Sequence, residues 1–137
     1  MTLSPNAALR LRKHADYQRV YAASRKQFAR QIAYFCALRS DAAAETDGPR
    51  IGLTVGKVMG KAVDRNRIKR RLRECVRRHA ALLRAPVDVI LHPRRSVLTL
   101  EFSVLDQEVA QVFRAVQLAV DRGQVKQQAP LARRSEG

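Results

Sequence analysis

Residues 50–78 of the chain, RIGLTVGKVMGKAVDRNRIKRRLRECVRR, contain the pattern that decides the fold: a strand, then a turn, then a basic helix. Ile51, Leu53 and Val55 alternate with small or polar residues. This period of two predicts a strand with one buried face over residues 50–55. The strand is expected to lead directly into the turn and the helix that follow it.

Two glycines, Gly56 and Gly60, bracket the turn, and Asp64 is expected to cap a long helix that starts near Arg65. Pro86 is expected to end this helix. Apolar side chains recur at helical spacing and form one stripe, made of Ile68, Leu72, Cys75, Val76, His79 and Leu83. The stripe predicts that this face of the helix packs on a sheet.

Further elements are predicted on either side of this segment. Helical spacing of apolar residues predicts helices over residues 9–23 and 106–120, and apolar, β-branched runs predict strands over residues 31–39 and 87–91. The small, acidic segment 40–49 is expected to be a surface loop that connects two antiparallel strands. The order helix, two strands, helix, strand, helix predicts an α+β fold in which helices pack on one sheet.

Length and composition indicate one folded domain. The chain has 137 residues, of which 46% are hydrophobic. We expect a single domain over residues 1–121 and a flexible polar tail over residues 122–137. No apolar run reaches the roughly 18 residues that cross a bilayer, and the N-terminus lacks a secretory pattern, so a cytoplasmic location is expected. Cys36 and Cys75 are expected to be small buried thiols, although a bridge between them stays open.

Positive charge dominates the chain and is concentrated in the predicted basic helix. The net charge is +15, and residues 57–78 hold ten basic side chains against two acidic ones. One helical stripe, opposite the apolar one, consists of Asn66, Arg70, Arg73 and Arg77. A solvated helix face usually interleaves glutamate with lysine, but only Glu74 is available here. The pattern therefore favours nucleic acid as the partner, with an anionic membrane surface as the weaker alternative.

The string of residues 57–74 resembles the signature of the bacterial ribonuclease P protein family. Its centre is the triplet RNR at residues 65–67, followed by IKR at 68–70 and RE at 73–74. The preceding segment RIGLTV resembles the strand that leads into the family's basic loop, and DYQRVY at residues 16–21 resembles its aromatic helix. The resemblance extends from about Leu9 to Val120, with the elements in the family's order.

This resemblance implies a two-layer α/β sandwich of the ribosomal protein S5 domain 2-like type, in which a left-handed βαβ crossover carries the basic helix. It also implies a non-catalytic protein subunit of an RNA-based endoribonuclease. The expected partners are ribonuclease P RNA and the 5′ leader of precursor tRNA, and the RNA, with its Mg²⁺, is expected to perform the cleavage. No cofactor or metal is expected on the protein itself, and no membrane or DNA partner.

Two sets of residues are expected to contact RNA. By resemblance, the catalytic RNA binds a basic loop and helix that comprise Lys57, Lys61, Arg65, Asn66, Arg67, Lys69, Arg70, Arg73 and Arg77. A cleft between the first helix and the sheet would hold the single-stranded leader, with the walls formed by Tyr17, Tyr21, Ala33 and Phe35. Unpaired bases stack on aromatic side chains, but aromatic residues at this spacing are also common in cores.

Other functions stay open on the residues alone. A DNA-binding helix of the homeodomain type is expected to have a tryptophan before the basic run, and the chain contains no tryptophan. A structural ribosomal protein would share the charge and the fold class. A free-standing nuclease would need paired carboxylates or histidines, yet His14, His79 and His92 are isolated in the sequence. His79 lies on the apolar stripe and is expected to be a core histidine with its hydrogen bonds satisfied.

Overall fold

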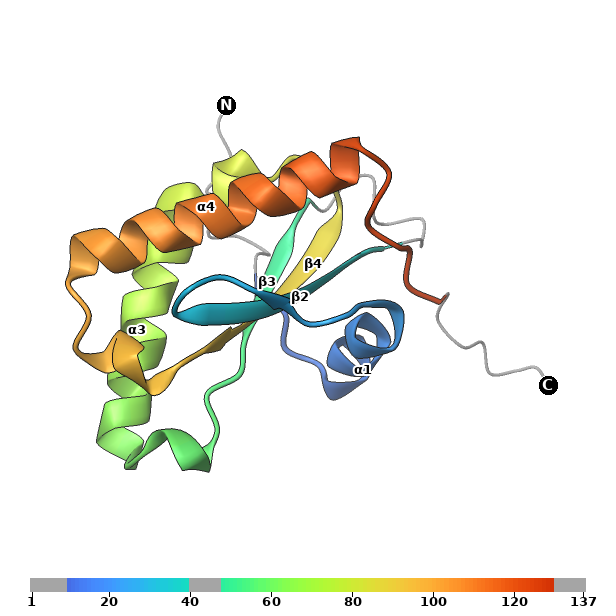
Figure 1. Ribbon diagram of the computed structural model, residues 1–137. Coiled ribbons are helices and arrows are strands. Elements are labelled where there is room, and N and C mark those ends of the chain that lie inside the picture. The colour runs from blue at the N-terminus through green and yellow to red at the C-terminus, as the bar shows by residue number, and fades with distance from the viewer. Residues whose placement is uncertain (1–9, 40–47, 130–137) are drawn as a thin grey trace.

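The computed structural model describes residues 10–39 and 48–129 (Figure 1). The described elements are α1 (His14–Ala23), β1 (Gln27–Phe28), β2 (Ile32–Leu38), β3 (Arg50–Leu53), α3 (Ala62–His79), β4 (Val87–Pro93) and α4 (Phe102–Asp121). Short 3-10 turns occur at η1 (Lys57–Met59), η2 (Ala80–Leu82) and η3 (Arg95–Leu98). The α+β class predicted from the sequence is confirmed. The loop expected over residues 40–49 falls largely outside the described residues.

The four strands form one mixed sheet in the order β1-β2-β4-β3. β2 pairs with β4 antiparallel, whereas β3 pairs with β4 parallel, so α3 is the crossover that a parallel pair requires. The strands before and after residues 40–49, β2 and β3, run antiparallel as predicted, but they do not pair because β4 lies between them. The composition of β4 explains its central place: residues 87–91 are buried on both faces.

Helices cover both faces of this sheet. The larger core lies between the sheet and the pair α3 and α4, and it includes Val89, Ile68 and Phe113. A smaller core lies on the opposite face, where Val20 of α1 packs with Ile90. Figure 1 accordingly shows α1 apart from α3 and α4. The expected two-layer arrangement is therefore wrong, because alternate residues of β2 and β4 are apolar on both sides and α1 covers the second side.

The first helix is shorter than the sequence predicts because the residues before it extend the sheet. α1 begins at His14 rather than near residue 9. Arg10 forms a parallel bridge with Ile51, and the Leu11 amide donates to the Ile51 carbonyl at 3.0 Å. The N-terminal segment therefore runs along the outer edge of β3, a long-range pairing that helical periodicity does not reveal.

Two other boundaries differ from the prediction. α3 begins at Ala62, and its N-cap is Lys61, so the expected cap Asp64 lies in the first turn instead. A carboxylate in the first turn still complements the positive end of the helix dipole. α4 begins at Phe102 rather than near residue 106, and β4 continues through Pro93.

The beginning of the expected tail docks on the sheet. The Leu38 amide donates to the Lys126 carbonyl at 2.9 Å, and Gln127 forms a parallel bridge with Leu38. The Gln128 side chain is buried and donates to Asp88 at 2.8 Å. Residues 126–128 are therefore held against β2 and are not loose, while residues 130–137 lie outside the described residues. Both cysteines are free thiols, Cys75 buried and Cys36 partly buried.

Candidate nucleic-acid interface

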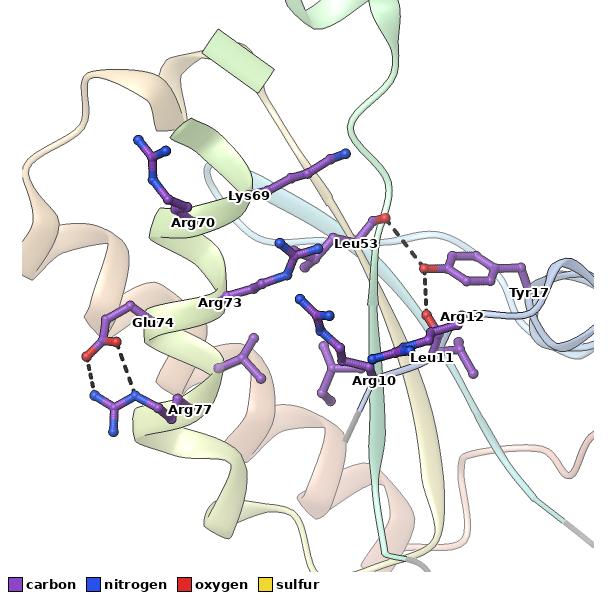
Figure 2. A pocket seen from close by; sticks show the side chains of 12 residues that line it. Arg10, Leu11, Arg12, Tyr17, Leu53, Lys69, Arg70, Arg73, Glu74 and Arg77 are labelled. Atoms are coloured by element: carbon purple, nitrogen blue, oxygen red, sulfur yellow. Dashed lines mark hydrogen bonds and ion pairs between the residues drawn. The ribbon is translucent and has the colours of Figure 1, made fainter. Parts of the chain in front are cut away.

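A basic groove runs between α3 and the outer edge of β3. We call this hollow of about 940 Å³ the basic groove; its charged lining consists of Arg10, Arg12, Lys69, Arg70, Arg73, Glu74 and Arg77. Figure 2 shows Lys69 and Arg73 reaching from α3 toward β3, with Arg10 facing them from the N-terminal segment. The aliphatic part of the lining consists of Leu11, Ile51, Leu53 and Val76. The groove thus offers several cations around a partly apolar surface.

Several positive charges lie close together in the basic groove. Partial burial lowers the pKa of Arg73, and the charges of Arg10 and Arg12 lower it further. Across residues 10–39 and 48–129, no carboxylate lies within ion-pair distance of these three arginines. The one acid in the lining, Glu74, accepts from Arg77 of its own helix and does not neutralise the others. A polyanion in the groove would relieve this repulsion.

The predicted basic residues are divided among several surroundings. Lys57, Lys61, Asn66, Arg67, Arg70, Arg73 and Arg77 are exposed. Lys69 is partly buried beside the groove. Arg65 is also partly buried, because its Nε donates to the Gly60 carbonyl at 3.1 Å and so fastens the turn before α3. Gly60 has a φ of 123°, a conformation that favours glycine.

Two arginines of the same helix turn away from the groove. Arg71 donates to the Leu100 carbonyl and lies over the ring of Phe102. Arg78 pairs with Asp106 at 3.2 Å, and His79 hydrogen-bonds the same carboxylate at 2.9 Å. These side chains join α3 to the start of α4. The predicted hydrogen bond of His79 is thus present, but the expectation of a core position is wrong, because the side chain is 23% exposed beside the start of α4.

The four residues predicted to wall a leader cleft lie on the α1 side of the sheet. Tyr21 meets Phe35 edge to face, with ring centroids 4.9 Å apart, and Tyr17 lies 6.4 Å from Tyr21. Ala33 is two residues from Phe35 on the same face of β2 and is 8% exposed. We refer to this surface, with His92 added, as the aromatic face. Its rings are partly buried and partly open to solvent.

His92 is a member of the aromatic face that sequence reasoning missed. Its Nε2 lies 3.0 Å from the Tyr21 hydroxyl, and its ring centroid lies 5.2 Å from that of Phe35. Burial lowers its pKa, and the charge of Lys26 lowers it further, so both favour the neutral form of the ring. The sequence predicts a strand that ends before His92, whereas β4 continues through Pro93. The sequence pattern therefore did not place His92 on a face of the sheet.

Tyr17 joins the aromatic face to the basic groove. Its hydroxyl donates to the Leu11 carbonyl at 3.1 Å, with a second, longer contact to the Leu53 carbonyl at 3.5 Å. The same side chain lines the groove. The sequence does not indicate a role for Arg10 and Arg12, because its pattern predicts a helix over residues 9–23 rather than a segment along the edge of β3. No local pattern predicts that edge pairing.

The described part of the chain offers no site for a metal and no membrane span. Over these residues, no three histidine, cysteine, aspartate or glutamate side chains are grouped to hold a metal ion. None of the described helices is long and apolar enough to cross a bilayer.

Comparison with known proteins assigns the family. The chain matches the family model for ribonuclease P over residues 6–117. It is 38% identical over 111 residues to the ribonuclease P protein component of Brucella suis, covering 78% of this chain and 79% of that protein. Its fold is similar to the RNase P protein of Staphylococcus aureus, with a TM-score of 0.66, 28% identity, and coverage of 80% and 95%.

A more distant likeness concerns the fold alone. The RNase P protein from Thermotoga maritima has a TM-score of 0.66 at 21% identity, with coverage of 77% of this chain and 96% of that chain. The resemblance drawn from the RNR string is thus confirmed. The chain belongs to the bacterial ribonuclease P protein component family, and it is the protein subunit of the RNA-based endonuclease that processes the 5′ ends of tRNA.

Proposed function

We propose that this subunit binds ribonuclease P RNA through the basic groove and the exposed side of α3. The observation that carries the proposal is the cluster of Arg10, Arg12 and Arg73, three cations around one hollow that form no ion pair with any carboxylate of the described residues. Guanidinium groups donate paired hydrogen bonds to phosphate oxygens, so an RNA backbone suits this surface. The exposed Arg67 and Arg70 extend the same positive surface along α3.

We further propose that the aromatic face holds the 5′ leader of precursor tRNA. Tyr21, Phe35 and His92 present rings on a surface that joins the basic groove at Tyr17. Single-stranded RNA leaves its bases available for stacking, and a neutral histidine adds a hydrogen-bonding edge. The leader would then leave the catalytic RNA at the groove and cross the sheet over these rings.

Chemistry in this assembly is assigned to the RNA. The Mg²⁺ that supports phosphodiester cleavage is expected on the partner RNA, and the protein contributes binding and orientation. We also retain as predictions the left-handed sense of the β3–α3–β4 crossover and the ribosomal protein S5 domain 2-like description of the fold.

Cleavage of precursor tRNA by a bacterial ribonuclease P RNA at low Mg²⁺, with and without this protein, tests the proposal. Strong stimulation is expected from the wild-type protein. Arg73→Ala should reduce the stimulation because it removes the central cation of the groove, and Arg10→Ala should act in the same direction. The matched control is Arg114→Ala, which removes an equal charge from an exposed position on α4 away from the groove.

Affinity measurements separate the two surfaces. Groove variants should weaken binding of the protein to the RNA subunit, and the loss should shrink at high salt. Tyr21→Ala should leave that binding intact and weaken the holoenzyme's preference for precursor over mature tRNA. A groove variant as active as Arg114→Ala at every protein concentration would refute the assignment of the groove to the RNA subunit.

A further inference from the structure

Phe28 is a large apolar side chain that the fold leaves in solvent. It lies on β1, at the edge of the sheet, and is 68% exposed. No other aromatic residue is among the exposed large hydrophobic residues in the described part of the chain. Neither hydrophobic core includes it. A single exposed apolar side chain is common on protein surfaces, so the case for Phe28 rests on its neighbours: the aromatic face and an adjacent cation.

Strand register places Phe28 on the same side of the sheet as the aromatic face. Phe28 pairs directly with Ala33 of β2, and Ala33 pairs with His92 of β4. Directly opposed residues point to the same side of a sheet. The neighbouring pair confirms this, because Gln27 pairs with Tyr34 and both line a hollow against α4 on the other side. Phe28, Ala33 and His92 therefore form one row across three strands.

Phe28 is the exposed end of this row. Ala33, between the two rings, contributes only a methyl group and is 8% exposed. Two strand spacings of about 4.8 Å separate these rings by about 10 Å at the backbone. α1 ends at Ala23 and packs over the other end of β2, where Val20 meets Ala37. Tyr21 of α1 nevertheless lies 3.0 Å from His92, so α1 covers the His92 end of the row and leaves the Phe28 end exposed.

A cation accompanies the exposed ring. The Lys26 ammonium lies 5.8 Å from the centroid of the Phe28 ring. Lys26 is itself exposed, as are Arg25 and Arg30 on the same hairpin. An aromatic platform flanked by positive charge is the combination that single-stranded nucleic acid binders use, since the ring stacks on a base while the cation attracts the backbone.

We propose that Phe28, with Lys26 beside it, is an additional stacking position for the leader of precursor tRNA. The inference rests on the proposed function of the aromatic face and extends it to the far edge of the sheet. The basic groove lies at the β3 edge and Phe28 at the β1 edge, so a leader that starts at the groove crosses three strand spacings, about 14 Å, before reaching Phe28. At about 3.4 Å per stacked nucleotide, this span corresponds to about four nucleotides.

Leader length supplies the test. Holoenzyme reconstituted with a bacterial ribonuclease P RNA is titrated with precursor tRNAs whose leaders have about 2 or about 8 nucleotides, one shorter and one longer than the span. Phe28→Ala should weaken binding of the long-leader substrate by about 5- to 140-fold, the range that loss of one stacked base implies. Binding of the short-leader substrate should not change.

Matched variants separate stacking from folding. Phe28→Trp should retain long-leader affinity because it keeps an aromatic platform, whereas Phe28→Leu should behave like Phe28→Ala because it is apolar without stacking. Leu118→Ala removes a half-exposed apolar side chain from α4 and should change neither substrate. The thermal midpoint of Phe28→Ala should match that of the wild type, since the ring is exposed.

The outcomes also distinguish this inference from the function on which it rests. If the wild-type holoenzyme prefers the long leader and Phe28→Ala retains that preference, Phe28 has no stacking role and the leader role of the aromatic face stands. Equal weakening of both substrates would likewise overturn the inference, because it would indicate an effect on the tRNA body or on assembly. If the wild type binds both leaders equally, the proposed leader role and this inference both fail.

Discussion

At the scale of single residues, Gly52 shows how one missing side chain positions Tyr17. A Cβ at position 52 would lie 2.7 Å from Cζ of Tyr17 and closer still to its hydroxyl. The tyrosine ring therefore occupies the space that glycine leaves, and its hydroxyl reaches the Leu11 carbonyl from there. Glycine is needed here because the Tyr17 ring lies close to the backbone of β3, and not because the backbone adopts an unusual angle.

Gly52→Ala should displace Tyr17 and loosen the N-terminal segment from β3. The expected loss is about 1–3 kcal/mol of unfolding free energy, typical of a side chain forced into an occupied site. Chemical denaturation measures this loss, and RNA binding should weaken with it because Arg10 lies on the displaced segment. The control is Gly56→Ala, where a Cβ meets nothing within 4 Å and φ is −85°. Equal stability of the two variants would contradict this account of Gly52.

Asp88 is the buried acid on which several segments converge. Arg39 and Arg50 both pair with its carboxylate at 2.7 Å, and Gln128 donates to it at 2.8 Å. Burial by itself would raise the pKa of Asp88, but hydrogen bonds from Arg50, Gln128 and Arg39 outweigh it and hold the pKa below its ordinary value. The carboxylate thus ties β2, β3 and residues 126–128 to β4.

Asp88→Asn should destabilise the fold by about 3–5 kcal/mol, because it leaves the buried Arg39 without its counter-charge. The pH dependence follows from the lowered pKa: the carboxylate stabilises the fold above its unfolded pKa of about 3.9, and this contribution is lost as pH falls through the folded value. Denaturation curves between neutral pH and about pH 3 should therefore show a shallower acid loss for Asp88→Asn. Asp121→Asn, at an exposed position, should retain the wild-type profile.

At the scale of elements, α3 carries three different faces. Ile68, Leu72 and Cys75 are fully buried in the main core. Arg71 and Arg78 face the start of α4, and the remaining basic side chains face the groove or solvent. The run of positive charge in the sequence thus mixes residues that hold the fold with residues available to RNA.

Arg71→Ala should therefore change the stability of the protein, whereas Arg70→Ala should change its binding to RNA. Arg71→Ala should lower the unfolding free energy by about 1–2 kcal/mol, because it loses the bond to Leu100 and its packing on Phe102. Arg70→Ala should leave stability unchanged and reduce the slope of log K against log salt by about 0.7–0.9, the effect of one lost phosphate contact. Denaturation and salt-dependent RNA binding, measured on both variants, check this contrast. Identical profiles would mean that α3 is not divided as described.

The sequence predicts the elements better than their ends or partners. Strong periodicity located β2, β3, β4, α3 and α4. It missed β1, because a two-residue strand has no period to detect. It extended α1 into residues that pair with Ile51, since the helical pattern there competes with a long-range sheet contact. Helical spacing predicted the exposed stripe of Asn66, Arg70, Arg73 and Arg77, and the resemblance supplied the other predicted site residues of α3. Tertiary pairing alone brings Arg10, Arg12 and His92 to the proposed surfaces.

At the scale of the whole molecule, the strand order explains how distant segments build the surface that we propose for RNA. β4 lies at the centre, which places β3 with the basic groove at one edge and β1 with Phe28 at the other. The sheet between them presents Ala33, Phe35 and His92. Topology of this kind depends on which strand is apolar on both faces, and the sequence alone left that choice open.

Net charge makes the stability of the isolated protein depend on anions. The chain carries +15, and the cations of the basic groove are held close together by the fold. We expect the isolated protein to be partly unfolded at low salt and to be stabilised by sulfate, which binds the native groove more tightly than the unfolded chain. Sulfate at about 100 times its dissociation constant would add about 2.7 kcal/mol.

Thermal midpoints measured in sulfate and in chloride at equal ionic strength separate site binding from general screening. The midpoint should rise further in sulfate, and Arg73→Ala should lose most of this difference because it removes the cation that Arg10 and Arg12 face. Arg114→Ala should retain it, since that arginine lies on α4 outside the groove. Equal midpoints in the two salts would mean that charge is screened over the whole surface, and the groove would then have no special affinity for phosphate-like anions.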